Sequence, residues 1–391
     1  MILKNCQLIP ELCEDFQETK ADIRIEGNLI AEILPANGTY TDQEIIDCTG
    51  KTVLPGLFNI HVHLFFNTMD WPKIRGGQTP FEHTMNAVRY MNKLLAHGYT
   101  FIRDVGSPYN IAINMRNDVN AGKMTGPTIL ASGPIITPDQ IAPPELEAYS
   151  DNPHKEPAND PYLLRGIARK TIAGGADFIK ILGCSVIPGK RGDTPLFYPD
   201  EMDALLEVVK RENTYLAIHT NGTESNNSAL DYEAYTVEHA NFWTDTNTQK
   251  WIEHGKVSNL VPTLTVCMQW GEEFCHMSAD SLRLAYDAGI PMGWGTDATE
   301  EAFMANTALE FIARESCWNI PRVEILKQAT INSAKIMKTD AERGTIKAGK
   351  IADLIVLDQN PIDDLNAFAK PCAYVLKDGV VVASNGLVKA I

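Results

Sequence analysis

The stretch LFNIHVHL, residues 57–64, is a candidate strand that carries two histidines near its end. His61 and His63 are two positions apart, so their side chains point to the same face of the strand. Two imidazoles on one face can converge on a metal ion. Such a pair alone more often forms hydrogen bonds at a protein surface, so its interpretation depends on the residues downstream.

Residues 57–64 begin a regular alternation of candidate strands and helices. Further strands are predicted at residues 100–105, 128–132, 177–182, 215–219, 236–239, 257–265 and 290–296. Helices are predicted at residues 81–96, 110–121, 162–173, 199–212, 246–253, 279–288, 302–315 and 321–336. Eight alternating strands imply an α/β protein with a parallel sheet, and eight strands close a (β/α)₈ TIM barrel. The alternative, a doubly wound open sheet, requires a glycine-rich phosphate loop, and GSPYN at 106–110 is not one.

Both ends of the chain read as short strands joined by turns. The stretch 21–34 alternates apolar and polar residues around Gly27-Asn28, and the stretch 372–384 contains the turn Asp378-Gly379. Both dipeptides are hairpin signals. We therefore expect a small β-sandwich domain built from residues 1–55 plus 345–391, and a barrel domain at residues 56–344.

Composition restricts the partners of the chain. Its 391 residues carry a net charge of −16 without a Lys/Arg run, which argues against nucleic acid and anionic membrane surfaces as partners. The eight cysteines form no CxxC pair, and scattered cysteines fit a reducing compartment. We expect a cytoplasmic protein that acts on a small molecule, and a homo-oligomer is compatible with the sequence. No signal peptide or membrane-spanning run is expected.

Four further residues occupy positions comparable to those of the two histidines. Lys180 lies in DFIKIL, and His219, His239 and Asp297 each end a candidate strand. The carboxyl ends of barrel strands form the functional face, and in a closed barrel the eighth strand would bring Asp297 to the first. A buried lysine requires a partner, such as Asp177 or Asp297, or a modification. Reaction with carbon dioxide would give an anionic carbamate whose two oxygens can bridge two cations.

Charge counting supports a two-metal site. Two divalent ions bring four positive charges, and a carbamate, a carboxylate and a bridging hydroxide bring three negative ones. Neutral histidines complete a ligand set that suits Zn²⁺, with Mn²⁺, Fe²⁺ and Co²⁺ as alternatives. The predicted metal ligands are His61, His63, Lys180, His219, His239 and Asp297.

With these residues the sequence resembles the amidohydrolase superfamily, in its binuclear-metal branch with a carboxylated lysine. The resemblance covers essentially the whole chain and rests on the motifs VLPGLFNIHVHL (53–64), DFIKIL (177–182), AIHTNG (217–222), VEHA (237–240), GTDA (295–298) and GTIKAGKIADLIVLDQNP (344–361). Two further phrases make it most similar to the prolidase-like and imidazolonepropionase-related group, namely IRDVGSP (102–108) and ILASGP (129–134).

The chain departs from the dipeptidases of that group where substrate is recognised. TPDQIAPPE at 137–145 replaces a Gly-Gly-His stretch, and Asn221 replaces an aromatic residue. We read residues 137–160 as an active-site loop or a surface insertion. The candidate substrate-binding residues are Asn221, Arg103, Asp139 and Trp294. Arg103 could instead pair with Asp104 or a neighbouring loop, and Trp294 could fill the barrel.

The resemblance implies hydrolysis of an amide C–N bond, in a dipeptide of the Xaa-Pro type or an N-acyl amino acid. We expect a metal-bridging hydroxide to attack the carbonyl, and Asp297 to accept its proton and deliver it to the leaving nitrogen. Hydrolysis of a cyclic amide such as an imidazolone or hydantoin is one alternative. A ring deaminase is another, although that type generally lacks the bridging lysine. A non-catalytic scaffold would have lost ligands, and none is missing here.

Overall fold

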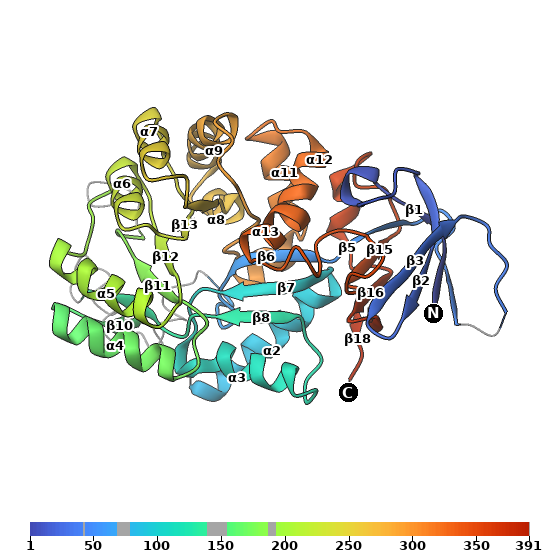
Figure 1. The fold of residues 1–391 in the computed structure, drawn as a ribbon, viewed down its shortest axis with the longest axis horizontal. Helices are drawn as coiled ribbons and strands as arrows, with labels where there is room; N and C mark the ends of the chain where they lie inside the picture. Colours follow the sequence, from blue (N-terminus) through green and yellow to red (C-terminus); the bar gives the residue numbers. More distant parts are fainter. Residues whose placement is uncertain (42–43, 69–78, 139–154, 187–192, 391) are drawn as a thin grey trace.

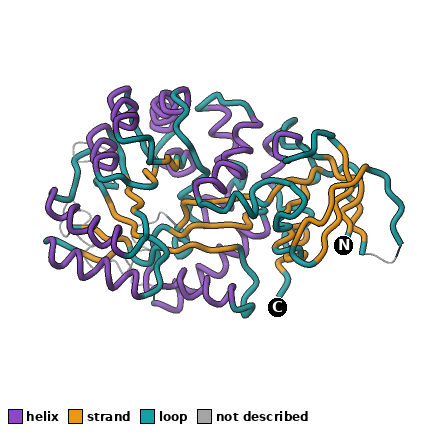
Figure 2. The backbone as a smooth tube through the Cα atoms, in the orientation of Figure 1, coloured by secondary structure: helices purple, strands orange, loops and turns teal. Residues whose placement is uncertain are grey.

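The computed structural model describes residues 1–41, 44–68, 79–138, 155–186 and 193–390. Strands from both ends of the chain lie together at one side of the molecule, and both termini lie there (Figure 1). A larger region of strands and helices makes up the rest. Its helices lie mostly outside its strands (Figure 2). No helix among the described residues has the length and apolar character needed to cross a bilayer.

Among the described residues, nine strands form one sheet in the order β18-β17-β16-β15-β5-β1-β2-β3, with β4 paired to β1. Their bounds are β1 Ile2–Gln7, β2 Lys20–Glu26, β3 Leu29–Pro35, β4 Ile45–Asp47, β5 Thr52–Pro55, β15 Leu354–Leu357, β16 Tyr374–Lys377, β17 Val380–Ser384 and β18 Leu387–Val388. The antiparallel pairing of β5 with β15 joins the two ends of the chain. Residues from both ends, including Leu3, Ile23 and Leu354, also share one apolar core. The pairing gives a single connected sheet, so the β-sandwich stays a prediction.

Both predicted hairpins are present in this sheet. β2 pairs with β3 up to Glu26 and Leu29, and β16 pairs with β17 up to Lys377 and Val380. Gly379 has a φ of 77°, in the left-handed region that glycine adopts without steric cost. The two turns also touch, because a Cβ on Gly379 would collide with the main-chain oxygen of Gly27. Glycine at this position therefore permits the close approach of the two chain ends.

The central strands divide into two parallel sheets among the described residues. One has the order β6-β7-β8 and the other the order β10-β9-β11-β12-β13-β14. Their bounds are β6 Leu57–Val62, β7 Tyr99–Asp104, β8 Thr128–Ala131, β9 Ile135–Thr137, β10 Lys155–Pro157, β11 Ile179–Leu182, β12 Leu216–His219, β13 Thr236–Glu238 and β14 Asn259–Val261. A main-chain hydrogen bond of 2.9 Å from Asp177 to Ala131 links the two sheets. The strand pairing alone does not show a closed barrel.

The predicted eighth strand at 290–296 is not formed as a regular strand. Its residues make one isolated bridge, between Leu260 and Met292, and a few main-chain hydrogen bonds. Ile60 N donates to Trp294 O at 2.8 Å, and Gly293 N donates to Leu260 O at 2.9 Å. The segment therefore lies between β14 and β6. A Cβ on Gly295 would lie 2.7 Å from the Cβ of His61, so glycine permits a backbone approach closer than a regular strand allows.

The helices cover the outside of the central strands (Figure 2). Their bounds are α2 Pro80–Ala96, α3 Ile111–Asn120, α4 Pro161–Ala173, α5 Pro199–Arg211, α6 Thr223–Asp231, α7 Asp245–Glu253, α8 Leu264–Gln269, α9 Glu272–Asp287, α10 Glu300–Ala305, α11 Leu309–Ser316, α12 Arg322–Lys327 and α13 Ser333–Ile336. Several start at a side-chain cap, such as Thr79 of α2 and Thr299 of α10. Each cap satisfies a main-chain N–H that the helix itself leaves unbonded.

The prediction and the structure differ at other elements as well. Helix α6 was not predicted, because its sequence TESNNSALD is largely polar. The strand predicted at 257–265 ends at Val261, where Pro262 has no N–H to continue the ladder, and α8 follows. The helix predicted at 302–315 is two helices, since Asn306 is extended. The helix predicted at 321–336 contains a π-helical turn at Gln328–Asn332.

A buried ion pair on α11 fixes the segment that follows β14. Arg314 is fully buried and its Nε donates to Glu310 at 2.8 Å. Its two Nη groups donate to the carbonyls of Pro262 and Gly293, at 2.8 and 3.1 Å. Glu310 accepts from the main-chain N–H groups of Leu264 and Thr265. One ion pair therefore holds the end of β14, the start of α8 and the segment 290–296 in place.

Replacing Arg314 with Met should lower the free energy of unfolding by about 3–5 kcal/mol, because it leaves the Glu310 carboxylate buried without its cation. Denaturant titration measures this change. The matched control is Arg283→Met, which removes another i,i+4 pair whose side chains are 42% and 56% exposed. That control should cost only about 0.3–0.5 kcal/mol. Equal losses in the two variants would contradict the role given to Arg314.

Candidate metal centre

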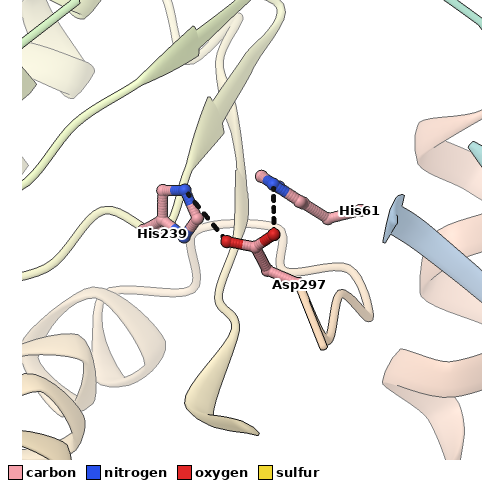
Figure 3. A group of neighbouring side chains, drawn as sticks. All are labelled: His61, His239 and Asp297. Carbon is pink, nitrogen blue, oxygen red and sulfur yellow. Dashed lines mark ion pairs between the residues drawn. The ribbon is translucent and has the colours of Figure 1, made fainter. Parts of the chain in front are cut away.

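Three histidines surround the carboxylate of Asp297. His61 Nε2 and His63 Nε2 lie 3.7 and 3.5 Å from Asp297 Oδ1, and His239 Nε2 lies 4.0 Å from Oδ2. Figure 3 shows the rings of His61 and His239 directed at the two oxygens of the carboxylate. Asp297 reaches this place because its main-chain N–H donates to the carbonyl of His61 at 3.0 Å.

The other two predicted ligands lie beside this group. The ring of His219 packs against that of His239, with centroids 4.5 Å apart. Lys180 is 2% exposed and lies within β11, paired in register with Ala217 of β12. It forms no ion pair with any described residue, and Asp177 pairs instead with Arg116 at 2.5 Å. Lys180 is thus a buried amine that has no ion-pair partner among the described residues.

Each of the three histidines around Asp297 is anchored through its other ring nitrogen. His61 Nδ1 lies 2.7 Å from Glu238 Oε2, His63 Nδ1 lies 2.7 Å from Gly106 O, and His239 Nδ1 lies 2.6 Å from Thr263 Oγ1. These contacts turn the three Nε2 atoms toward the carboxylate. Anchoring of this kind fixes the ring orientation and tautomer that a metal ligand needs.

Glu238 is a site residue that the sequence analysis missed. It is fully buried between His61 and Arg103, whose Nη2 donates to Glu238 Oε1 at 2.7 Å. The remaining Arg103 donors bind the Ile60 carbonyl and Thr236 Oγ1, at 2.6 and 2.8 Å. Arg103 therefore lies behind His61, and its ion-pair partner is Glu238 rather than Asp104. A buried arginine requires a carboxylate partner, so Arg103 in the strand IRDVGSP indicates a buried acidic residue elsewhere in the chain. Glu238 in VEHA, beside the predicted ligand His239, was the residue in the sequence that could have been chosen as this partner.

Backbone strain accompanies the site. His239 and Asp297 adopt positive φ values of 66° and 48°, which are uncommon for residues other than glycine. The left-handed turn at His239 comes directly after β13 ends at Glu238, so the side chains of two consecutive residues can both reach His61. Strained conformations of this kind concentrate at functional sites.

Burial sets the protonation of the group. Burial, with the nearby Lys180 charge, lowers the pKa of His63 to about 4, and burial lowers the pKa values of His61 and His239 well below their usual range. Neutral imidazoles are the form that binds metal. Burial also lowers the pKa of Lys180 and raises the pKa of Asp297. The neutral amine of Lys180 is the form that can react with carbon dioxide.

The donor set fits a metal ion. The ligand atoms of His61, His239 and Asp297 all lie within 4.8 Å of one another. His61 Nε2 is buried and has no hydrogen-bond partner among the described residues, an arrangement that is costly unless a ligand completes it. The separations of 3.5–4.0 Å between histidine nitrogens and Asp297 oxygens are too long for hydrogen bonds. They match two ligands that each lie about 2.0–2.2 Å from a shared ion.

The structure places the other candidate substrate contacts as follows. Asn221 Nδ2 lies 3.1 Å from His219 Nε2 and donates to the Ser185 carbonyl. Trp294 is fully buried, with its ring 4.4 Å from the Arg314 guanidinium carbon, so it packs into the core. Asp139 and most of the segment 137–160 lie outside the described residues.

Comparison with known proteins identifies relatives along most of the chain. Residues 52–383 match the model of the amidohydrolase family. Ochratoxinase of Aspergillus niger is 24% identical over 374 residues, which cover 86% of this chain and 76% of the relative. Imidazolonepropionase of Geobacillus kaustophilus is 24% identical over 390 residues, covering 89% of this chain and 84% of the relative.

Solved structures share the fold. A Xaa-Pro dipeptidase with methionine bound in its active site superposes with a TM-score of 0.86 at 26% identity, covering 97% of this chain and 98% of that one. A prolidase complexed with N-methylphosphonate-L-proline superposes with a TM-score of 0.83 at 24% identity, covering 98% of this chain and 99% of that one.

Replacing Glu238 with Gln should weaken metal affinity about 10–100-fold, because His61 loses the carboxylate that orients its ring. Competition with a chelating dye of known affinity measures this change, and circular dichroism checks that the fold persists. The matched control is Glu233→Gln, which replaces a carboxylate that is 59% exposed. This variant should leave the metal affinity unchanged. Unaltered affinity in the Glu238 variant would contradict the orienting role.

Proposed function

The chain belongs to the amidohydrolase family, and we propose that it is a metal-dependent hydrolase of small amides, with a dipeptide of the Xaa-Pro type or an N-acyl amino acid as substrate. The observation that carries the proposal is the buried Nε2 of His61, which lies opposite Asp297 and has no hydrogen-bond partner among the described residues. The likeness to the Xaa-Pro dipeptidase structure along 97% of this chain supports the substrate class.

The proposed ligand set keeps the six residues predicted from the sequence. His61, His63 and His239 would offer their Nε2 atoms to two divalent ions, Asp297 a carboxylate oxygen, and His219 a ring nitrogen. A divalent ion bound there supplies Lewis acidity, which polarises a carbonyl and brings the pKa of water close to 7. Zn²⁺ suits these ligands, and Mn²⁺, Fe²⁺ and Co²⁺ are the alternatives.

Lys180 would complete the site as a carbamate. Its neutral amine attacks carbon dioxide, a C–N bond forms, and one proton leaves to solvent. The product is an anion with two oxygens in place of an ammonium. Burial disfavours the charged ammonium, and no described residue forms an ion pair with it, so the neutral amine that reacts with carbon dioxide is more readily formed.

Asp297 would be the proton carrier of the reaction. Its carboxylate lies between three histidines at the carboxyl ends of the strands, and burial raises its pKa toward neutrality. A carboxylate of that basicity accepts a proton from the attacking water and then donates it to the leaving nitrogen. The products are a carboxylate and an amine. Glu238 and Arg103 take no part in this transfer, and hold His61 in position.

The architecture proposed around this site is a (β/α)₈ barrel at residues 56–344, with a separate β domain from residues 1–55 and 345–391. Hydrogen bonds support closure on both sides of the segment 290–296, toward β14 and toward β6. The bond from Asp177 to Ala131 supports closure between β8 and β11. The separate apolar core under the terminal strands supports the second domain.

Hydrolysis of a cyclic amide is the second candidate. The similarity to imidazolonepropionase of Geobacillus kaustophilus over 89% of this chain favours it. The same ligands and the same proton carrier would serve a ring amide. The difference lies in the contacts that recognise the substrate, so a substrate survey distinguishes the two candidates.

Replacing Asp297 with Asn should keep most of the bound metal and lower kcat at least about 100-fold, because the variant cannot carry the proton. Metal analysis and steady-state kinetics on one preparation measure both quantities. The control is Asp287→Asn, which changes an exposed carboxylate on α9. This variant should leave kcat unchanged. Full turnover by the Asp297 variant would rule out the assigned role.

The substrate class is tested by amine release from a pooled library of dipeptides and N-acyl amino acids. The protein is loaded with Zn²⁺ in the presence of bicarbonate, and a second pool holds imidazolones and hydantoins. We expect release from Xaa-Pro or related dipeptides, and none after treatment with a chelator. Turnover confined to the cyclic pool would replace the first candidate with the second, and no turnover in either pool would contradict both.

A further inference from the structure

A pair of thiols lies outside the candidate metal centre. Cys275, in the first turns of α9, and Cys317, at the end of α11, have sulfur atoms 3.7 Å apart. Both side chains are buried, with Cys275 fully buried and Cys317 8% exposed. His276 Nε2 lies 3.9 Å from the sulfur of Cys317. The two thiols are in van der Waals contact, and a disulfide requires their sulfur atoms to approach to about 2.05 Å.

A metal ion does not account for this arrangement. In the part of the chain that the structure describes, the set whose ligand atoms all lie within 4.8 Å of one another is His61, His239 and Asp297. The two thiols and His276 do not meet that condition. Among the described residues, the pair therefore offers two sulfur atoms in contact with each other, with His276 close to the sulfur of Cys317.

The two cysteines differ in their access to solvent. Burial and the neighbouring Cys317 raise the pKa of Cys275 above its usual range, so Cys275 stays a thiol. Cys317 keeps some exposed surface and has the ring of His276 beside it. An oxidant that arrives from solvent therefore meets Cys317 first.

We propose that Cys275 and Cys317 form a reversible disulfide when the protein meets a hydroperoxide. The Cys317 sulfur attacks the peroxide, an S–O bond forms as the O–O bond breaks, and an alcohol or water leaves. The Cys275 sulfur then attacks the sulfenic sulfur, the S–S bond forms, and the S–O oxygen leaves as water with the Cys275 proton. Two electrons pass from the two thiols to the peroxide, and a dithiol reductant reverses the change.

The bond would enclose the segment that carries Asp297. Cys275 and Cys317 are 42 positions apart in sequence, and Asp297 lies between them. Closing that loop removes conformational freedom from the unfolded chain and so stabilises the folded state. The disulfide would also join α9 covalently to α11, whose Glu310 holds the main chain of Leu264 and Thr265. The modification would therefore secure the segment behind the centre under oxidising conditions.

Mass spectrometry after peroxide treatment tests the proposal. The full-length protein is treated with hydrogen peroxide, remaining thiols are blocked with N-ethylmaleimide, and the chain is digested with trypsin. We expect the loss of two of the eight thiols and a crosslink between peptides 257–283 and 315–322. The first peptide also contains Cys267, so fragmentation must assign the bond to Cys275. Dithiothreitol should restore both thiols.

Variants and melting temperature provide the controls. Cys317→Ser and Cys275→Ala should each abolish the crosslink, whereas Cys372→Ala, at another buried cysteine, should retain it. The oxidised wild type should melt a few degrees above its reduced form, and the oxidised Cys317→Ser protein should not. A crosslink at Cys267, or irreversible oxidation of Cys317 while Cys275 stays reduced, would overturn the proposal. Equal melting temperatures of the oxidised and reduced wild type would overturn the stabilising role.

Discussion

Main-chain hydrogen bonds hold residues 292–297 between β14 and β6, and the candidate centre depends on them. The bonds at Gly293, Trp294 and Asp297 bring the carboxylate within 4.0 Å of three histidine nitrogens at the ends of β6 and β13. Gly295 permits the close approach to His61, and the Arg314–Glu310 ion pair fixes the same segment from behind. A displacement here would separate Asp297 from the histidines without altering any of the candidate ligands.

The second constraint is the compensation of buried charge. Arg103 and Glu238 are fully buried and satisfy each other, so neither is left as an isolated ion. Lys180 has no such ion pair among the described residues, although the charges of Glu238 and Asp297 act on it at longer range. The ion pair of Arg103 with Glu238 therefore orients His61, whereas the buried amine of Lys180 has no ion pair among the described residues. The supporting residues Arg103 and Glu238 are therefore held in place by their ion pair, whereas Lys180 is not held by one in the described part of the chain.

Much of this arrangement could be predicted from the sequence, because it depends on local patterns. The spacing of His61 and His63, both terminal hairpins and most central strands follow from periodicity and turn residues. The pairing of Arg103 with Glu238 did not follow, because it joins residues 135 positions apart that no local pattern links. Helix α6 was missed because its polar sequence lacks an apolar stripe. A regular eighth strand was predicted at 290–296 and is not formed, because the glycines of this segment allow its backbone to pack closely against neighbouring residues instead of pairing as a strand.

The central claim is that the six predicted ligands bind two divalent ions. Isothermal titration of Zn²⁺ into metal-free protein, in buffer with bicarbonate, tests it most directly. The account predicts two equivalents bound per chain by the wild type, and weaker or fewer ions bound by a Lys180→Met variant that cannot form a carbamate. Binding of less than one equivalent by the correctly folded wild type would contradict it.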